Sequence, residues 1–158
     1  MDKKDFIGQV VILMEEESEK IKSSFESSRK AAIEAPGAMQ SKSDTTKSQM
    51  SVLAGNFHDS FLKLQSSIVA TKRIDVSKKY ERVGVGAIVL VQEGKTKAYY
   101  FVMPPDSGSY EVKYGDSKVC TISLNSPIAQ ALVRKRAGEQ IKFQVPAGLR
   151  IFRILQIE

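Results

Sequence analysis

A regular stripe of apolar residues runs through the last part of the first half of the chain. Its members step by three or four residues, the spacing of a coiled-coil seam; they are Met50, Leu53, Phe57, Phe61, Leu64 and Ile68. A similar but weaker stripe precedes it, formed by Phe6, Val10, Leu13, Glu17, Ile21, Phe25, Ser28 and Ala32. The two stripes predict two long helices.

A helix-breaking segment separates the two stripes. It spans residues 35–43 and contains Pro36 and Gly37, which interrupt helices. Candidate caps for the helix starts are Asp2 or Asp5 for the first helix and Asp44 or Thr45 for the second. Two stripes joined by a short breaker predict an antiparallel helical hairpin, a rod about 45 Å long at a rise of ~1.5 Å per residue.

Beyond residue 77 the apolar pattern changes to short runs of β-branched and aromatic residues, which predict strands. The expected strands are 83–91, 96–103, 109–113, 119–124, 141–145 and 149–157, with residues 146–148 as a hairpin loop between the last two. Ser126 followed by Pro127 predicts the start of a short helix, whose end is expected at Lys135, Arg136 and Gly138. The predicted class is therefore α+β: an antiparallel coiled-coil hairpin followed by an antiparallel β-domain of four to six strands with one short helix.

Composition divides the chain at the same place. All five Tyr and seven of the ten Gly lie beyond residue 76. The first 76 residues contain 11 basic and 11 acidic side chains, whereas the rest contain 13 and 7, so the second half carries the whole net charge of +6. The predicted units are a hairpin over 1–76, with its tip at about 34–47, and a β-domain over 77–158.

Composition also excludes several classes of protein. A hydrophobic content of 42% is too high for a disordered chain, and no apolar run approaches the 18 residues of a membrane span. The apolar patch after the start of the chain ends at Glu15, too early and too acidic for a secretory signal. Cys120 and His58 are the only residues of their types, which excludes a disulfide framework and multi-His metal chemistry. The expected setting is a reducing cytoplasm, and we expect no membrane partner.

One stretch of the second half has a family signature. Residues 122–132 read Ile-Ser-Leu-Asn-Ser-Pro-Ile-Ala-Gln-Ala-Leu, and Gly138-Glu139 follows. This run resembles the signature of the bacterial Gre transcript-cleavage factors, GreA and GreB. The resemblance implies a coiled-coil hairpin of about 75 residues before an FKBP-like β-domain of about 80, and the order and lengths of the predicted units agree with it.

The resemblance also implies a function and a partner. In that family the β-domain docks on RNA polymerase at the rim of the secondary channel, and the residues that match the docking turn here are Asn125, Ser126, Pro127 and Ile128. The hairpin enters the channel, where acidic tip residues help hold the second catalytic Mg²⁺ of the polymerase. The factor is then an accessory protein and not itself an enzyme. It has no cofactor of its own, it meets nascent RNA and DNA only through the elongation complex, and we expect a monomer.

The tip departs from the family pattern. Cleavage-competent members carry Asp-x-x-Glu at the start of the second helix, and the matching residues here read Ser-Lys-Ser-Asp from Ser41 to Asp44. The tip candidates are Asp44 as the metal contact, Glu34 across the loop and Ser41. A neutral hydroxyl is a poorer Mg²⁺ ligand than a carboxylate, and Lys42 and Lys47 oppose a divalent cation. Two functions stay open: stimulation of transcript cleavage, or regulation of the polymerase without cleavage.

Simpler interpretations accompany each candidate. Asp44 is also a possible helix cap, Glu34 a solvated helix-end charge, and Ser126-Pro127 taken alone a common helix start.

Two further functions remain as distant alternatives. The first is prolyl isomerase activity, which the resemblance to an FKBP-like domain suggests. The active site of a prolyl isomerase needs an aromatic-walled pocket, however, and the chain has no Trp. The second is direct binding of DNA or RNA, which the basic second half suggests. This half lacks a recognisable motif of interleaved basic and aromatic residues, however.

Overall fold

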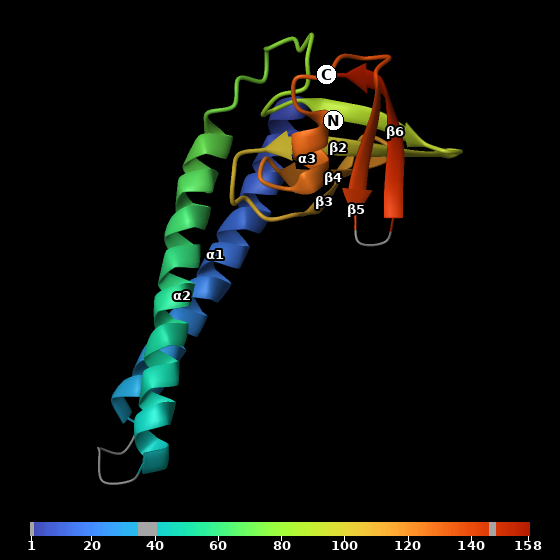
Figure 1. The fold of residues 1–158 in the computed structure, drawn as a ribbon. Helices are drawn as coiled ribbons and strands as arrows, with labels where there is room; N and C mark the ends of the chain where they lie inside the picture. Colours follow the sequence, from blue (N-terminus) through green and yellow to red (C-terminus); the bar gives the residue numbers. More distant parts are fainter. Residues whose placement is uncertain (1, 35–40, 146–147) are drawn as a thin grey trace.

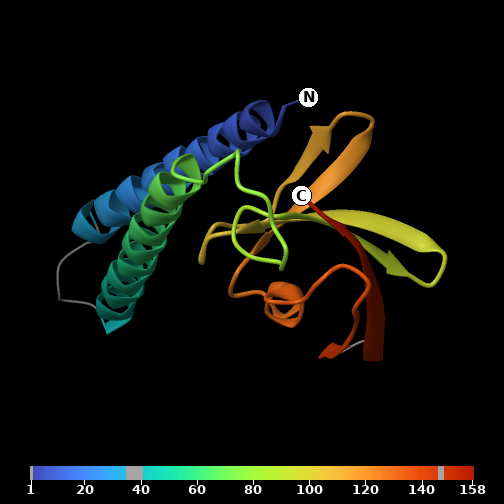
Figure 2. The ribbon, with the colours of Figure 1, turned by 90° about the horizontal axis from the view of Figure 1, so that it is seen from above.

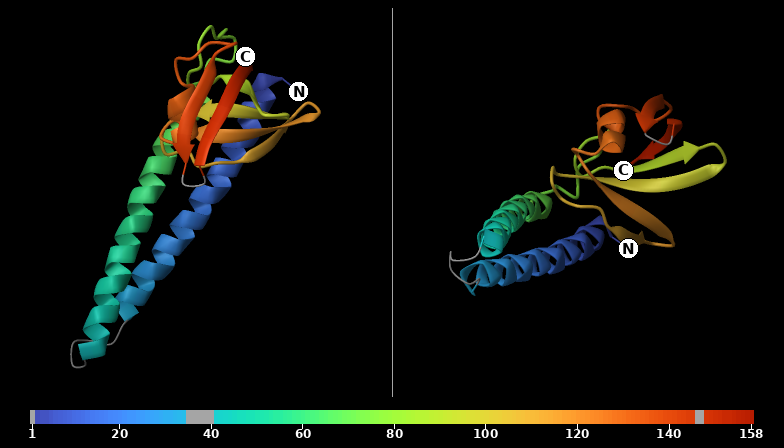
Figure 3. Two further views of the ribbon diagram at one scale, coloured as in Figure 1. Left: turned by 45° about the vertical axis from the view of Figure 1, so that its right-hand side comes forward. Right: turned by 60° about the horizontal axis from the view of Figure 1, so that its bottom comes forward.

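A rod of two helices projects from a small β-domain in the computed structural model, which describes residues 2–34, 41–145 and 148–158 (Figure 1). For residues 41–47 and 145 only the course of the backbone is described. Helix α1 spans Lys3–Glu34 and helix α2 spans Ser41–Lys72, each of 32 residues, or about 48 Å at 1.5 Å per residue. The two helices lie side by side in every view (Figure 3), so the predicted hairpin is confirmed. Within the described ranges, no helix is long and apolar enough to cross a bilayer.

The predicted seam holds best at the base of the rod. Phe6 and Val10 of α1 and Leu64 and Ile68 of α2 are buried. Toward the tip, α1 is the only described element beside α2, and the prediction is wrong for Leu53, which is 40% exposed while its neighbour Ala54 is buried. A small side chain at the contact allows two helices to approach closely, which a large one does not.

The expected start of the second helix is also wrong. Because α2 begins at Ser41, the end of the predicted breaker is helical, and neither Asp44 nor Thr45 is its N-cap. Residues 35–40 lie outside the described residues. The first helix begins directly after Asp2, as expected, and the Phe6 amide donates to the Asp2 carbonyl oxygen at 3.0 Å.

Six strands form one mixed sheet in the order β3-β4-β2-β1-β6-β5. Their bounds are β1 Ile88–Glu93, β2 Thr96–Met103, β3 Glu111–Tyr114, β4 Ser117–Ser123, β5 Gln140–Val145 and β6 Gly148–Ile157. A short helix, α3 (Pro127–Leu132), lies between β4 and β5 in the chain. The six strands and the helix were predicted, but the β2–β4 pair is parallel where antiparallel pairing was expected. Strand β3 and its turn reverse the chain once more between β2 and β4, and this extra reversal makes the two parallel.

The first strand is shorter than predicted because its expected start is a turn. The Ala87 amide donates to the Gly84 carbonyl oxygen at 3.0 Å, and Gly86 has φ +89°. A Cβ on Gly86 would lie 2.5 Å from the Tyr80 hydroxyl, so a side chain is excluded there. Residues 146–147 of the other predicted turn lie outside the described residues, and Gly148 pairs with Val145.

The two faces of the sheet pack against different helices (Figure 2). On one face, Phe6 of α1 meets Phe101 and Tyr114 with ring centroids 5.1 and 5.5 Å apart. On the other face, Ala129 and Leu132 of α3 join a core of strand residues from β1, β2, β4, β5 and β6. The base of the hairpin and the sheet therefore share one hydrophobic core.

The first turn of α1 also contacts the segment that follows α2. The ammonium of Lys3 lies 4.7 Å from the centre of the Tyr80 ring, a cation–π contact. Burial lowers the pKa of Lys3, while the nearby charges of Glu158 and Asp75 act in the opposite direction. This contact ties the N-terminus of α1 to the connection between the two units.

Replacement of Phe6 by alanine tests whether the shared core holds the molecule together. Because the ring is fully buried, Phe6→Ala should lower the free energy of unfolding by about 3–5 kcal/mol. Ile12→Ala on the same helix is the control, since Ile12 is 55% exposed, and it should change the stability by less than about 1 kcal/mol. Urea denaturation followed by circular dichroism measures both. Equal losses in the two variants would contradict the shared core.

Candidate functional site

The predicted site residues lie at opposite ends of the molecule. Glu34 and the start of α2 are at the far end of the rod, whereas residues 125–128 belong to the β-domain (Figure 1). The structure therefore divides the candidates into two separate groups. We call them the hairpin tip (residues 34–47) and the Ser-Pro turn (Asn125, Ser126, Pro127 and Ile128).

At the hairpin tip the structure describes one of the three candidate side chains. Glu34 is the last residue of α1, and its carboxylate lies 3.8 Å from the ammonium of Lys30, one helical turn away. Both side chains are mostly exposed, at 64% and 74%, so this ion pair contributes little to stability. Ser41 and Asp44 fall in the first turn of α2, and their side chains lie outside the described residues.

No group of three or more His, Cys, Asp or Glu residues with metal-binding geometry occurs in the described parts of the chain. Near the tip, the described side chains around the two helices are mixed in character. A shallow groove is lined by Arg29, Ala32, Ile33, Ser51 and Ala54. Glu34, already paired with Lys30, does not by itself fit a Mg²⁺ site.

The Ser-Pro turn is held in place by the helix that it starts. Ser126 is the N-cap of α3, with φ −71° and ψ 146°, and its hydroxyl oxygen accepts from the Ala129 amide at 3.3 Å. Pro127 occupies the first helical position, where its missing amide hydrogen costs nothing. The predicted helix start is confirmed. Pro127 and Asn125 are exposed at the surface and Ile128 is half-buried.

The helix that follows this turn ends earlier than predicted. Helix α3 stops at Leu132, and Arg134, with φ +67°, leaves the helical path, four residues before the expected Gly138. Two bonds fix the departing chain: the Arg134 amide donates to the Val83 carbonyl oxygen, and the Val83 amide to the Lys135 carbonyl oxygen, both at 2.8 Å. A long-range contact thus decides the end of the helix, which local sequence does not reveal.

A loop that sequence reasoning missed joins the Ser-Pro turn to the hairpin. We call residues 104–110, which follow β2, the 104–110 loop. The Asn125 side-chain amide donates to the Asp106 carboxylate at 3.1 Å, and Asp106 has φ +58°. On its other side, the Ser67 hydroxyl of α2 donates to the Pro105 carbonyl oxygen. The sequence Pro-Pro-Asp-Ser-Gly signals a turn, but not which elements the turn connects.

The same loop contacts the other helix of the hairpin. The Tyr110 hydroxyl donates to the Glu17 carboxylate of α1, and the Tyr110 amide donates to the Thr121 hydroxyl at 2.7 Å. Gly108 has φ +78°, and a Cβ there would lie 2.8 Å from the Tyr110 hydroxyl. Burial, followed by the hydrogen bond to Glu17, raises the pKa of Tyr110. Both helices are therefore fixed to one loop.

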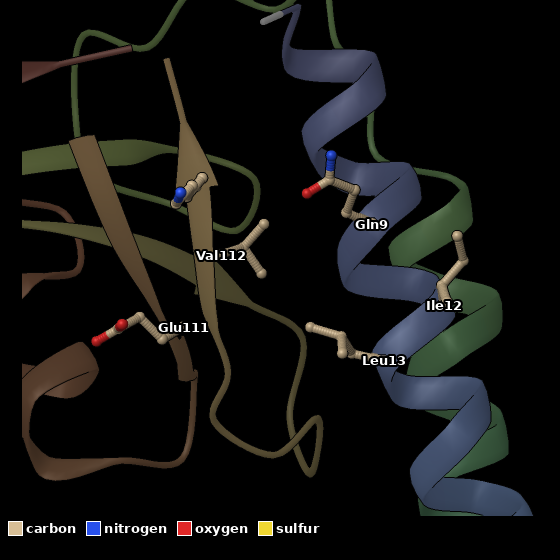
Figure 4. Close-up of a pocket in the computed structure, with 6 residues that line it drawn as sticks. Gln9, Ile12, Leu13, Glu111 and Val112 are labelled. Atoms are coloured by element: carbon tan, nitrogen blue, oxygen red, sulfur yellow. The ribbon is translucent and has the colours of Figure 1, made fainter. Parts of the chain in front are cut away.

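A groove of about 320 Å³ lies beside this contact, between α1 and the edge strand β3 (Figure 4). Its lining combines apolar and polar side chains: Gln9, Ile12, Leu13, Glu111, Val112 and Lys113. No aromatic residue is part of this lining, nor of the grooves at the tip and beside the 104–110 loop. The aromatic-walled pocket that a prolyl isomerase needs is therefore not formed by these three grooves.

The fold and these two groups define a class of protein: a helical rod mounted on a β-domain, with an exposed Ser-Pro turn that is linked to the rod through the 104–110 loop. The family model described as "Transcription elongation factor, GreA/GreB, C-term" matches residues 77–158. The chain belongs to the GreA/GreB family, which confirms the resemblance seen in residues 122–132.

Individual relatives agree with the family model. The chain is 31% identical over 104 residues to transcription elongation factor GreA of Syntrophus aciditrophicus, a match that covers 63% of this chain and 60% of the relative. It is 34% identical over 99 residues to GreA of Nitrosococcus oceani, with 60% and 58% covered. The matched part of the chain thus spans about 60% of the length of these curated relatives.

Solved structures give weaker matches. Gfh1 of Thermus aquaticus shares 18% identity at a TM-score of 0.41, covering 98% of this chain and 95% of that one. A GreA/GreB elongation factor from Nitrosomonas europaea shares 16% identity at a TM-score of 0.38, covering 65% and 78%. The family assignment rests on the family model and the sequence relatives.

The Tyr110–Glu17 contact predicts a loss of stability at alkaline pH. Folding raises the pKa of Tyr110 above its ordinary value of 10.0, so its contribution is present below about pH 10 and is lost as the pH rises further. Tyr110→Phe should therefore lose less stability than the wild type between about pH 9 and pH 11. Tyrosines that remain in both proteins cancel in this difference. Urea unfolding at a series of pH values measures it, and equal slopes for both proteins would contradict the prediction.

Proposed function

We propose that this protein is a Gre-like elongation regulator that binds RNA polymerase at the rim of the secondary channel through the Ser-Pro turn and inserts its hairpin toward the active site. Membership of the GreA/GreB family supports the partner, and the resemblance of residues 122–132 supports the contact. The protein then acts in the cytoplasm as an accessory factor, and the polymerase performs the chemistry.

The observation that carries the proposal is the hydrogen-bonded link between the Ser-Pro turn and the rod. Asn125 bonds to Asp106, and the neighbouring Pro105 bonds to Ser67 of α2. A channel-entering factor needs its tip at a defined position relative to its docking point, because a misplaced group loses its effect at the target. The rod of about 48 Å and its shared core with the sheet meet this need.

The tip supports regulation with little stimulation of cleavage. Cleavage in this family requires acidic side chains that help hold a polymerase Mg²⁺, and a hard cation prefers several carboxylate oxygens. The described candidate, Glu34, is paired with Lys30, and the family's first tip carboxylate is replaced by Ser41. We therefore propose a modulator of initiation or pausing, and we assign any residual cleavage to Asp44.

Replacement of the Ser-Pro turn tests the docking. The double variant Ser126→Glu, Pro127→Ala should weaken binding to core RNA polymerase at least tenfold in a pull-down or fluorescence titration, because it adds a charge and reshapes the exposed turn. Thr96→Glu is the control: it adds the same charge at an exposed position at the start of β2. Circular dichroism checks that the variants fold. If the folded double variant binds like the control, the docking assignment is wrong.

A cleavage assay tests the role of the tip. Stalled elongation complexes incubated with Mg²⁺ and this protein should show weak or no shortening of the RNA, because the tip lacks paired carboxylates. The variant Ser41→Asp, Asp44→Glu restores the family's acidic pattern and should increase shortening. Efficient shortening by the wild type that disappears in Asp44→Ala would contradict the proposed modulator and identify Asp44 as the metal contact.

A further inference from the structure

Part of the sheet face that carries α1 is not covered by any described element. Strand positions alternate between faces, and α1 packs on the β3, β4 and β2 end of its face. Beyond it, the pairing register places Lys97, Gln92, Arg153 and Gln140 in one row across β2, β1, β6 and β5. The next rows on the same face pair Lys142 with Ile151 and Gln144 with Leu149. We name these eight residues the open strip.

The charges of the open strip are of one sign. Lys97, Lys142 and Arg153 are exposed, and none of them forms an ion pair with another residue in the described part of the chain. The strip contains no carboxylate. The nearest acid along β6, Glu158, lies past the end of the strand.

Two cations on the opposite face of the sheet form ion pairs. Arg150 bonds to Glu93, and Lys118 bonds to Glu111 at 2.6 Å. Two of the three strand cations on the face with α3 are thus paired, and Lys113 beside Lys118 is the exception, whereas the three cations of the open strip form no ion pair with the described residues. Unpaired cations gathered on one surface attract a partner of negative charge.

The apolar residues of the open strip distinguish between two kinds of acidic partner. Leu149 is 59% exposed and Ile151 is 38% exposed, and both lie beside the basic row. Protein interfaces combine an apolar core with a polar rim. Single-stranded nucleic acids are bound by aromatic side chains that stack on the bases, and the open strip has none.

The dimensions of the strip suit a folded partner. Neighbouring strands lie about 4.8 Å apart, so Lys97 and Arg153, two strands apart, are separated by roughly 10 Å. Carboxylates two turns apart on a helix are about 10.5 Å apart, and one such helix matches the basic row.

We infer that the open strip is a second contact surface for RNA polymerase and takes an acidic surface of that enzyme that also carries aliphatic side chains. This inference rests on the proposed function. The open strip continues the sheet face on which α1, the first helix of the inserted rod, is mounted. A partner that receives the rod therefore meets the same face of the domain.

Charge reversal tests the inference with core RNA polymerase as the probe. The triple variant K97E, K142E and R153E should weaken binding at least tenfold and reduce its dependence on salt, since charge-mediated contacts are screened by ions. The control R73E, K79E and K113E makes the same change of charge at exposed positions outside the strip and should bind within about twofold of the wild type. The pair Leu149→Ser, Ile151→Ser should weaken binding at least threefold. A glutamine version of the triple variant serves if the glutamates impair folding.

The outcomes separate this inference from the proposed function. If the triple variant binds like its control while the Ser-Pro variant loses binding, the open strip is not a polymerase contact and the docking stands. If the Ser-Pro variant also binds normally, the proposed function fails. If the serine pair binds normally and the triple variant instead loses salt-sensitive binding to free RNA or duplex DNA, the occupant is a nucleic acid and the inference is wrong.

Discussion

The burial of the first turns of α1 against the sheet is the contact on which the other features depend. A two-helix rod buries only one seam, and its outer half shows how little that provides, since large side chains such as Leu53 remain partly exposed there. At its base, the rod adds Phe6, Val10 and Met14 to the core of the β-domain, where all three are fully buried. Helix α1 thereby covers part of one face of the sheet, and the same contact positions the base of the rod on the β-domain.

The 104–110 loop turns this contact into a defined direction. Apolar packing fixes that two surfaces meet but tolerates small rotations, whereas hydrogen bonds depend on distance and angle. Tyr110 bonds to α1 and the Pro105 carbonyl accepts from α2, so the loop holds the rod at two points. The bond from Asn125 to Asp106 extends the same attachment to the Ser-Pro turn. For a factor proposed to act at the end of a rod, these attachments relate the position of the docking turn to the position of the tip.

The sequence predicted the elements better than their limits or their pairing. Strand β2 was found at its predicted bounds, because a run of β-branched and aromatic residues ended by two prolines depends on local properties alone. The start of β1 was missed because Tyr80 packs against Gly86 and turns the chain there. The end of α3 was missed because Val83, about fifty residues earlier, bonds to the departing chain. Of the candidate site, the Ser-Pro helix start was visible in the sequence, but its partner Asp106 was not.

The sequence by itself determined that the chain forms a hairpin and a β-domain and that it carries the Gre-type signature, because periodicity, breakers and a contiguous motif are local properties. Only the tertiary structure decided how these parts act together. It joined the base of the hairpin to the sheet in one core, linked the Ser-Pro turn to α2 through Pro105 and Asp106, and sorted the excess basic charge. Among the 13 basic residues of the second half, Lys118 and Arg150 form ion pairs on the face with α3, whereas Lys97, Lys142 and Arg153 form none with the described residues on the open strip. Which residues share a face depends on strand register, and register is fixed by pairing between segments that lie far apart in the chain.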